Sequence, residues 1–466
     1  MTKKYDAIII GAGMSGLAAG IRLAMFDNKV VILEKHVISG GLNSYYTRRI
    51  RETKELINFD VGLHALTNFA KKGEKKKPFT KLLKQLRIPY DSFQLKEQTN
   101  SLIKFESASL KFSNDFELMR SEVADTFHGE IDAFDKFTSF VSEFNEVDLN
   151  AKYTSARSVL DEYFSEELIK EMLIAPLLIY GSAWENDMDF SQFVIMFKSL
   201  YLEGFSRPEG GVRTILDLLL KRYADVGGEL KFRAEVLSID TNINGQIKGL
   251  TLKNGEHLET PKILSSAGLP ETFSLLNRKT EFKPEVGNLS FTETIFLIDK
   301  KKIINDFEST IVFYNKTDKY TYQKPTGAID NTSAVFCLPD NYDRSNQDGY
   351  GTIRVTHMAN YENWKSMAKP DYQTKKEEVF QEAFKLGENL LGSNLNLTFK
   401  DIFTPTTVEK YTKHFNGTVY GSTTKLRDGR TEVPGLFIIG TDQGFLGIVG
   451  SMLSGISMAN LHGLME

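Results

Sequence analysis

The chain has 466 residues, of which 41% are hydrophobic and 25% charged, and its net charge is -4 at pH 7. This composition is typical of a folded globular protein and excludes a disordered or fibrous chain. Because the charge is nearly balanced and no nucleic-acid-binding motif is present, nucleic acid is not an expected partner. The length predicts two or three domains.

Cys337 is the single cysteine, which excludes an internal disulfide and a redox-active dithiol. The histidines show no metal-ligand spacing, so we predict no metal site. Any redox chemistry therefore requires a bound cofactor. The N-terminal stretch lacks signal-peptide features, and no apolar run reaches the roughly 18 residues of a membrane span. We expect a cytoplasmic protein, with peripheral contact to the inner face of the membrane as an open alternative.

Residues 5–35 follow the pattern of a parallel α/β unit. Residues 7–10 are continuously apolar, residues 17–25 have helical periodicity, and residues 30–33 are apolar again. Strands of a parallel sheet are covered on both faces, so they appear in a sequence as unbroken apolar runs. The segment predicts a strand, a tight turn, a helix and a second strand.

The turn carries the pattern G-x-G-x-x-G at Gly11, Gly13 and Gly16, and Glu34 ends the next strand. Gly13 lets the backbone approach a pyrophosphate, which free amides and the positive end of the helix dipole bind. The Glu34 carboxylate can accept hydrogen bonds from the hydroxyls of an adenosine ribose, and it disfavours a 2′-phosphate. The pattern predicts a dinucleotide site for NAD or FAD rather than NADP.

A lysine-rich stretch, residues 71–87, marks the start of a different region. Phe79, Leu82, Leu83 and Leu86 recur among its lysines at near-helical spacing, which suits an anionic membrane surface. A solvated loop and helix is the commoner outcome of such charge runs, so both interpretations stay open.

The rest of the chain alternates between helical and β-rich segments. Residues 115–204 show helical periodicity with many phenylalanines, which predicts a helical cap. Residues 207–268 return to an α/β pattern, and residues 271–424 contain several short apolar runs that predict a second sheet. The last block, residues 433–464, predicts a strand, a glycine-rich turn and a closing helix.

Further motifs carry a family resemblance. They are Gly40-Gly41, the stretch from Phe59 to His64, the P-x-G-G element at residues 208–211, Tyr420-Gly421, and Gly440-Thr441-Asp442. From residue 5 to residue 463 the chain resembles the phytoene desaturase and carotenoid isomerase group, within the superfamily that includes flavin amine oxidases. The resemblance implies that FAD is the cofactor. Because no second G-x-G-x-x-G follows a strand, we expect no separate nicotinamide domain.

The resemblance implies an α/β fold with a Rossmann-like FAD-binding domain of the glutathione-reductase type. Residues 1–70, 205–270 and 425–466 would form this discontinuous domain. The remaining segments would form a substrate domain, with residues 71–204 as a helical, membrane-facing cap and residues 271–424 as a mixed sheet.

The resemblance also implies the residues that hold FAD. Val236 would pass the adenine, and Asp442 would bind the ribityl and phosphate region. Amides near the start of the closing helix would face the isoalloxazine ring, where a helix N-terminus stabilises negative charge. The predicted set is Gly11, Gly13, Met14, Ser15, Gly16, Glu34, Lys35, Gly41, Asn43, Gly62, Leu63, His64, Val236, Ala267, Gly268, Gly440, Asp442, Gly447, Ile448 and Val449.

Two residues are candidates for the reaction itself. His64 follows a turn that approaches the flavin in relatives, so its imidazole could relay a proton, although a structural hydrogen bond is the alternative. Trp184 ends the apolar run of the cap and could line a substrate cavity, although core packing is an equally good explanation. Asp60 is expected to stabilise the turn or to lie near the cofactor.

The preferred function is desaturation, saturation or isomerisation of double bonds in a long apolar polyene such as a carotenoid or retinoid, with an unidentified electron acceptor or donor. A flavin amine oxidase is the nearest alternative, but Leu42 and Asn43 stand where amine oxidases typically have arginine. The third candidate is a non-catalytic escort protein for prenylated GTPases. The intact glycine pattern and Glu34 argue against it.

Overall fold

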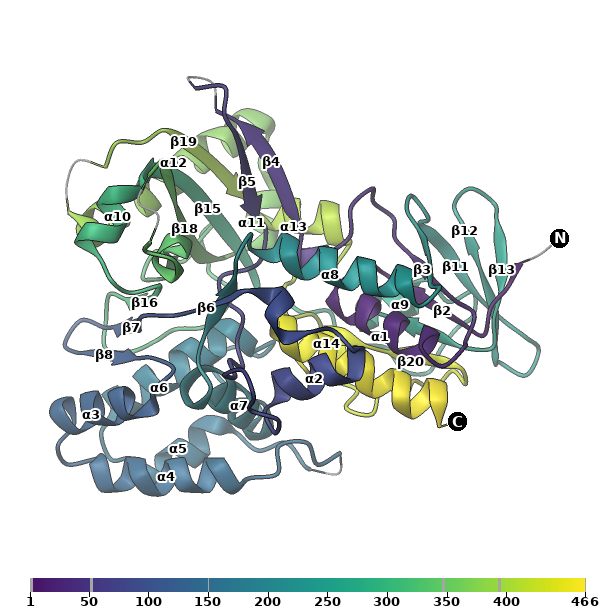
Figure 1. Cartoon of the computed structure of the whole chain (residues 1–466), viewed down its shortest axis with the longest axis horizontal. Helices are drawn as coiled ribbons and strands as arrows, with labels where there is room; N and C mark the ends of the chain where they lie inside the picture. The colour runs from purple at the N-terminus through teal and green to yellow at the C-terminus, as the bar shows by residue number, and fades with distance from the viewer. Residues whose placement is uncertain (1–2, 51–52, 150, 346–347, 393–394, 466) are drawn as a thin grey trace.

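A computed structural model describes residues 3–50, 53–149, 151–345, 348–392 and 395–465. It has two lobes (Figure 1). The dinucleotide lobe carries both chain ends and contains the first strands and the last helix. The second lobe divides into a half built on a large sheet and a half built of helices, which we call the cap.

The dinucleotide lobe is built on a parallel sheet of five strands, whose order β10-β3-β2-β14-β20 draws on segments far apart in sequence. The apolar runs predicted as strands are fully buried. The strands are β2 (Ala7–Ile10), β3 (Val30–Leu33), β10 (Glu229–Lys231), β14 (Ile263–Ser265) and β20 (Leu436–Ile438).

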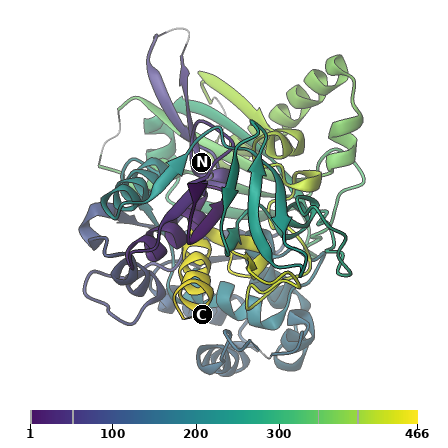
Figure 2. The same cartoon turned by 90° about the vertical axis from the view of Figure 1, so that its right-hand side faces the viewer.

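Helices cover one face of this sheet, and a smaller sheet covers the other. Figure 2 shows the smaller sheet in teal beside the purple N-terminal strands and the yellow C-terminal helix. The principal helices are α1 (Met14–Ala24), α8 (Val212–Asp225) and α14 (Gly447–Met458), and α9 (Leu269–Ser274) follows β14. The smaller sheet contains β1 (Lys3–Lys4), β13 (His257–Glu259), β12 (Ile247–Leu252) and β11 (Val236–Thr241).

The sheet of the second lobe has seven strands in the order β19-β15-β18-β17-β16-β7-β8. Its strands are β7 (Ser101–Lys104), β8 (Ser109–Phe112), β15 (Ser290–Asp299), β16 (Ile311–Asn315), β17 (Ser333–Cys337), β18 (Tyr350–Ala359) and β19 (Phe399–Phe403). Helices α10 (Lys300–Asp306), α11 (Tyr361–Ser366), α12 (Lys369–Leu391) and α13 (Pro405–Thr412) accompany it.

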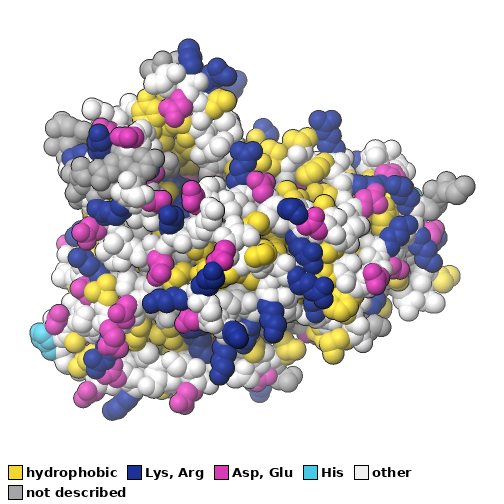
Figure 3. Space-filling model, viewed as in Figure 1, with side chains coloured by type: hydrophobic (Ala, Val, Ile, Leu, Met, Phe, Trp, Pro, Cys, Tyr) yellow, Lys and Arg dark blue, Asp and Glu magenta, His cyan; other side chains and the backbone are white. Residues whose placement is uncertain are grey.

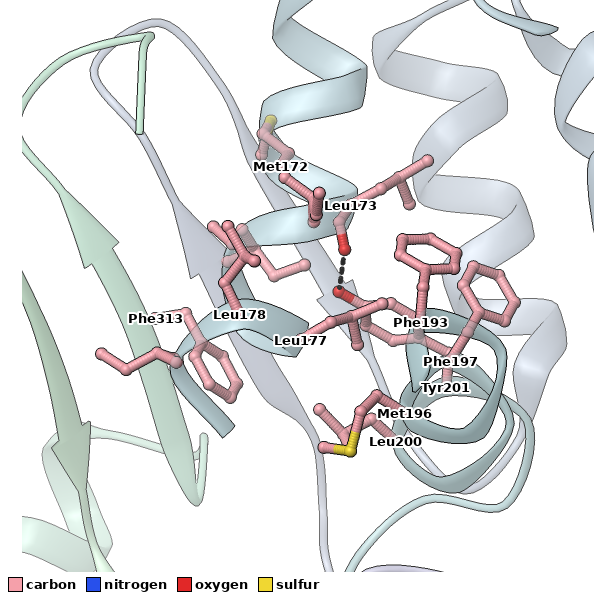
Figure 4. Close-up of a cluster of buried hydrophobic side chains, with 14 of the residues drawn as sticks. Met172, Leu173, Leu177, Leu178, Phe193, Met196, Phe197, Leu200, Tyr201 and Phe313 are labelled. Carbon is pink, nitrogen blue, oxygen red and sulfur yellow. Dashed lines mark hydrogen bonds between the residues drawn. The ribbon is translucent and has the colours of Figure 1, made fainter. Parts of the chain in front are cut away.

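The cap has an apolar core with many aromatic rings, part of which Figure 4 shows. The Tyr201 hydroxyl is buried there and donates to the Leu173 carbonyl at 3.0 Å, which satisfies the one polar group of that side chain. The cap helices are α3 (Phe116–Thr126), α4 (Ile131–Glu143), α5 (Ala156–Tyr163), α6 (Glu167–Gly181) and α7 (Phe190–Phe197). No helix of the described residues combines the length and apolar composition that a bilayer span needs.

The structure differs from the predicted segment boundaries in three places. Helix α2 (Pro78–Leu86) packs its apolar face into the dinucleotide lobe against α1 and α14, so this face is core rather than membrane-facing surface. Strands β7 and β8 of the predicted cap segment belong to the large sheet. The hairpin of β4 (Tyr45–Arg49) and β5 (Leu56–Asp60) packs on that sheet as well. Short strands β6 (Leu95–Glu97) and β9 (Ser206–Pro208) pair where the segments join.

Candidate FAD site and reaction centre

The glycine turn after β2 has two glycines that the protein itself requires. Gly11 has φ +96°, and a Cβ there would lie 2.4 Å from Ser266 Oγ. A Cβ on Gly16 would lie 2.0 Å from the Gly11 carbonyl oxygen. Gly13 differs, because its φ is -76° and its nearest neighbour would be the Gly40 carbonyl at 4.0 Å. Nothing within the protein demands glycine at position 13, so the open space there fits an external group such as a pyrophosphate.

Two helices whose first turns are predicted to face FAD begin without a side-chain cap. Neither Gly13, which precedes α1, nor Leu446, which precedes α14, has a capping hydrogen bond. The first amides of a helix have no partner within the helix, and together with the helix dipole they bind anions. The two helix ends therefore fit the phosphates and the electron-rich ring of a flavin dinucleotide.

The Glu34 carboxylate is buried, and two backbone amides orient it. Its Oε2 accepts from the Ala12 amide at 3.0 Å and its Oε1 from the His36 amide at 2.9 Å. Next to it, the Lys35 ammonium is buried without a hydrogen-bond partner. Burial, and secondarily the charge of Lys413, lower the pKa of Lys35 to about 8. An anchored carboxylate beside an unpartnered cation suits the adenosine end of FAD, as predicted for this position.

We expect Glu34→Ala to weaken FAD binding by roughly tenfold or more, because hydrogen bonds to a charged group contribute about 1.5–3 kcal/mol. The measurement is an equilibrium titration of the apoprotein with FAD. The neighbouring exposed residue Val37 offers a control, since Val37→Ala should leave the affinity unchanged. Equal FAD affinities for Glu34→Ala and the wild-type chain would place the ribose elsewhere.

The predicted turn at residues 40–43 lies next to Gly13 and also contacts the predicted turn at residues 60–64. Gly40 forms a bridge with Gly13, and its amide donates to the Ala12 carbonyl at 2.8 Å. A Cβ on Gly62 would lie 2.3 Å from the Leu42 carbonyl oxygen, so the turns at residues 40–43 and 60–64 touch. Leu63, Ile448 and Val449 belong to one extended core cluster, and a Cβ on Gly447, at the start of α14, would lie 3.9 Å from Thr67 Oγ1. The contacts of these turns with FAD stay predictions.

The Asp442 carboxylate is 1% exposed and is already held by protein donors. Its Oδ2 accepts from the Leu269 amide at 2.6 Å, and its Oδ1 accepts from the Ser422 amide at 2.9 Å and from Lys425 Nζ at 3.1 Å. A carboxylate has about four acceptor positions, and three are used here. Asp442 thus joins the start of α9 and the loop at residues 422–425 to the turn before α14, and its predicted contact with the ribityl chain stays a prediction. The predicted residues Val236, Ala267 and Gly268 lie at the start of β11 and just after β14.

His64 lies in a buried polar cluster that spans both lobes. Its Nε2 is 3.2 Å from Glu293 Oε1 and 3.3 Å from Thr356 Oγ1, and its Nδ1 is 3.4 Å from the Tyr180 hydroxyl. Arg354 Nε donates to the same Glu293 oxygen at 2.6 Å, and Thr356 donates to the other. A charged pair and an imidazole are therefore held together between the glycine turns and the cap.

The register of the large sheet assembles this cluster. Glu293 on β15 pairs with Thr356 on β18, and Arg354 on β18 pairs with Cys337 on β17. Paired residues project on the same side of a sheet, and so do residues two apart in one strand. All four side chains consequently face the same way. Arg354 Nη1 also donates to the Leu63 carbonyl at 2.8 Å, which ties the sheet to the turn that carries His64.

The cluster fixes the protonation of its members. Burial alone would lower the pKa of the His64 imidazole, but the adjacent Cys337 and Glu293 raise it to about 9. Burial would raise the pKa of Glu293, whereas Arg354 and His64 lower it to about 2. Burial raises the pKa of the Tyr180 phenol well above its usual range. At neutral pH the centre thus holds an imidazolium, a carboxylate, a guanidinium and a neutral phenol.

The comparisons with known proteins agree with this geometry. A family model described as an NAD(P)-binding Rossmann-like domain matches residues 9–86. The chain is 26% identical to the prolycopene isomerase of Daucus carota, over 98% of this chain and 80% of that protein. It is 25% identical to the lycopene-forming phytoene desaturase of Pantoea ananas, over 57% of this chain and 56% of that protein.

The chain is a phytoene desaturase-like and carotenoid isomerase-like oxidoreductase. The prediction of an FAD-dependent enzyme of this group is confirmed. A solved oxidoreductase of Methanosarcina mazei has the same fold, with a TM-score of 0.67 and 14% identity over 98% of this chain and 100% of that one.

In this desaturase-like chain Trp184 lines a cavity of about 630 Å³. Residues 443–446, which lead into α14, also line the cavity, so the cavity lies between the cap and the dinucleotide lobe. The location agrees with the predicted substrate contact of Trp184, which stays a proposal.

The sequence analysis did not identify Glu293, Arg354 or Thr356. The available signal was a charged residue inside each of two otherwise apolar predicted strands, since buried charges are rare unless they are paired. Asp60 was placed near the turn, and the structure shows it paired with Arg207 and accepting from the Val212 amide at 3.2 Å. Cys337, the single cysteine, lies beside His64.

Proposed function

We propose that this protein is an FAD-dependent enzyme that acts on carbon–carbon double bonds of a long apolar polyene, with His64 as its proton donor. The observation that carries the proposal is the His64 cluster, in which the imidazole lies 3.2 Å from the buried Glu293 carboxylate and 3.4 Å from the Tyr180 hydroxyl, between the glycine turns and an aromatic cap. Support comes from the relatives, whose names describe isomerisation and desaturation of carotenoids. No titratable group of this kind is needed merely to bind the cofactor.

Bound FAD supplies hydride transfer to or from a substrate carbon. The residues of the chain then hold the proton that the reaction uses and keep water out of the reaction centre. Glu293 and Arg354 hold the His64 ring in place and keep its proton on, and the Tyr180 phenol contacts the other ring nitrogen. Phe205 and Phe313 pack against Tyr180, with ring centroids 6.1 Å and 5.1 Å away, and exclude water. A dry, protonated centre suits protonation of a polyene carbon.

The direct test incubates the FAD-loaded protein with cis and trans carotenoids in liposomes, with and without a reductant, and analyses the products by chromatography and mass spectrometry. Isomerisation leaves the mass unchanged, whereas saturation and desaturation change it by two hydrogens per bond. His64→Gln should retain FAD and lose most of this activity. Release of hydrogen peroxide from amines, without any change in polyenes, would instead identify an amine oxidase.

The His64 ion pair predicts a pH-dependent contribution to stability. The folded-state pKa of about 9 lies above the ordinary value of 6.5, so the stabilisation is fully present below pH 6.5 and is lost as pH rises through 9. We expect the difference in unfolding free energy between the wild-type chain and His64→Gln to shrink over this window. Denaturant unfolding at several pH values measures it. A difference that is constant from pH 6 to pH 10 would mean that His64 is neutral.

The basic stretch before α2 supports a proposed contact with anionic membranes. Lys75 and Lys76 are exposed, whereas Lys77 lies 3.6 Å from Glu203. Figure 3 shows basic side chains gathered over the part of this face that contains α2. With the apolar face of α2 buried, the attraction must be electrostatic, at about 1 kcal/mol per lysine near the surface.

We therefore expect the double change Lys75→Glu and Lys76→Glu to reduce binding to phosphatidylserine liposomes at least tenfold, while flavin content stays the same. Exposed lysines of the second lobe provide the control, because Lys316→Glu with Lys319→Glu alters net charge equally. If both double variants bind liposomes like the wild-type chain, the stretch is a solvated loop.

A further inference from the structure

The turn that carries His64 is held through its carbonyl oxygens by two arginines. Arg354 Nη1 donates to the Leu63 carbonyl at 2.8 Å from the large sheet, and Arg207 Nη1 donates to the same oxygen at 3.1 Å from β9. Arg207 Nη1 is also 3.5 Å from the His64 carbonyl oxygen. A backbone carbonyl has two lone pairs, so guanidinium groups occupy both acceptor positions of Leu63. The two arginines therefore fix the backbone next to His64.

Arg207 is oriented by Asp60, and both belong to motifs that the sequence analysis singled out. Arg207 precedes the P-x-G-G element, and Asp60 lies in the stretch from Phe59 to His64. The Arg207 guanidinium donates to the Asp60 carboxylate, whose Oδ1 also accepts from the Val212 amide at 3.2 Å. A Cβ on Gly211 would overlap this carboxylate, so the glycine makes room for the ion pair. The two motifs therefore meet in one ion pair beside the His64 turn.

Backbone pairing brings Arg207 to this position. The Leu66 amide donates to the Ser206 carbonyl at 2.8 Å, and the Ser206 amide donates to the Leu66 carbonyl at 2.9 Å. This pairing places the next residue, Arg207, beside the turn. A guanidinium is planar and presents its donors in a fixed fork, so the bond to Asp60 sets the direction of the bonds to the turn.

The two arginines differ in what they contact. Arg354 Nε donates to Glu293 Oε1 at 2.6 Å, and the same oxygen lies 3.2 Å from His64 Nε2. Arg354 thus acts on the charge beside the imidazole as well as on the turn. Arg207 contacts the Asp60 carboxylate and the backbone of the turn. Its removal should therefore move or loosen the His64 ring without removing the counter-charge of the ring.

We propose that Arg207, oriented by Asp60, is a positioning residue for His64, which holds the imidazole at one place in the reaction centre. The proposal rests on the proposed function for the role of His64 as a proton donor, and it adds the residues that place this donor.

The test uses FAD-loaded Arg207→Gln with two measurements. The first is the kinetics of polyene conversion, and the second, which does not depend on the reaction, is NMR of protein that is isotopically labelled at histidine Cε1. His64→Gln identifies the His64 resonance. We expect kcat to fall by roughly 10- to 100-fold with KM and flavin content unchanged, because a small displacement of a reacting group has such an effect. The His64 resonance should broaden or split, because the ring no longer occupies one position.

Two further variants separate positioning from a loss of stability. Arg207→Gln leaves the Asp60 carboxylate without its partner, which is costly in a buried site. The double change Arg207→Gln with Asp60→Asn removes both charges, so it should unfold closer to the wild-type chain and still show the low kcat. Arg157 gives the matched control in the cap, where it donates to the Glu171 carboxylate at 2.8 Å and 3.0 Å. Arg157→Gln should leave kcat and the His64 resonance unchanged.

The outcomes separate this inference from the proposed function. A broadened or split His64 resonance in Arg207→Gln would support the positioning role even where no polyene is converted, a result that would refute the reaction alone. Wild-type kcat and an unaltered resonance in Arg207→Gln would overturn the positioning role and leave the reaction intact. Equal losses of kcat in Arg207→Gln and Arg157→Gln would also overturn it, because the loss of any such ion pair would then have the same effect.

Discussion

Replacing Arg354 by methionine is expected to lower the free energy of unfolding by about 3–5 kcal/mol, the cost of leaving one member of a buried ion pair without its partner. Arg354 is 2% exposed and donates to Glu293 and to the Leu63 carbonyl. Its removal leaves the Glu293 carboxylate buried and breaks the tie between the large sheet and the 60–64 turn. Guanidinium unfolding of the apoprotein measures the effect.

A surface pair gives the matched control. Arg120 also forms a two-point contact with a carboxylate, Asp135, but both side chains are about two-fifths exposed. Exposed pairs contribute little, so Arg120→Met should change stability far less than Arg354→Met. Combining Arg354→Met with Glu293→Leu should restore part of the loss, because the buried carboxylate is then gone and the buried His64 imidazole, without its counter-charge, becomes neutral. Equal effects of the two single arginine changes would show that the Glu293 pair is not desolvated.

The dinucleotide site could be predicted from the sequence because the residues that define it lie close together along the chain. One strand–helix–strand unit contains all four residues of the motif, which are Gly11, Gly13, Gly16 and Glu34. Each residue type is required either by the geometry of the turn or by the ligand. The His64 cluster was not accessible in the same way. Glu293 and Thr356 become neighbours only through the register of β15 and β18, and a shift by one residue would turn them to opposite faces.

Helix α2 shows a second feature that could not be predicted from the sequence, namely which elements cover its apolar face. The spacing of Phe79, Leu82, Leu83 and Leu86 correctly indicated an amphipathic helix, and all four side chains are buried. Periodicity shows that a face is covered but not what covers it. Here α1 and α14 cover it, and α14 comes from the opposite end of the chain. The surrounding lysines form the outer surface of this packed helix, and their contact with a membrane stays a proposal that rests on charge alone.

The second large effect is expected from Gly13→Ala, which should weaken FAD binding by roughly 5- to 150-fold, the equivalent of the 1–3 kcal/mol that overpacking by a methyl group costs. The backbone at Gly13 has φ -76°, which alanine adopts without strain, and the nearest atom to the new Cβ would be 4.0 Å away. The unfolding of the apoprotein should therefore be unchanged. Only the approach of a bound pyrophosphate to the backbone is obstructed.

Gly129 in the cap provides an exact counterpart, since it also lacks a positive φ and its Cβ would meet nothing closer than Glu166 Oε1 at 4.0 Å. Gly129→Ala should alter neither stability nor FAD affinity. Gly16→Ala should behave differently again, because its Cβ would overlap the Gly11 carbonyl and destabilise the turn even without cofactor. FAD titration together with apoprotein unfolding distinguishes the three variants. Normal FAD affinity in Gly13→Ala would show that the pyrophosphate does not pass over this residue, and the assignment of the glycine turn to the cofactor would then fail.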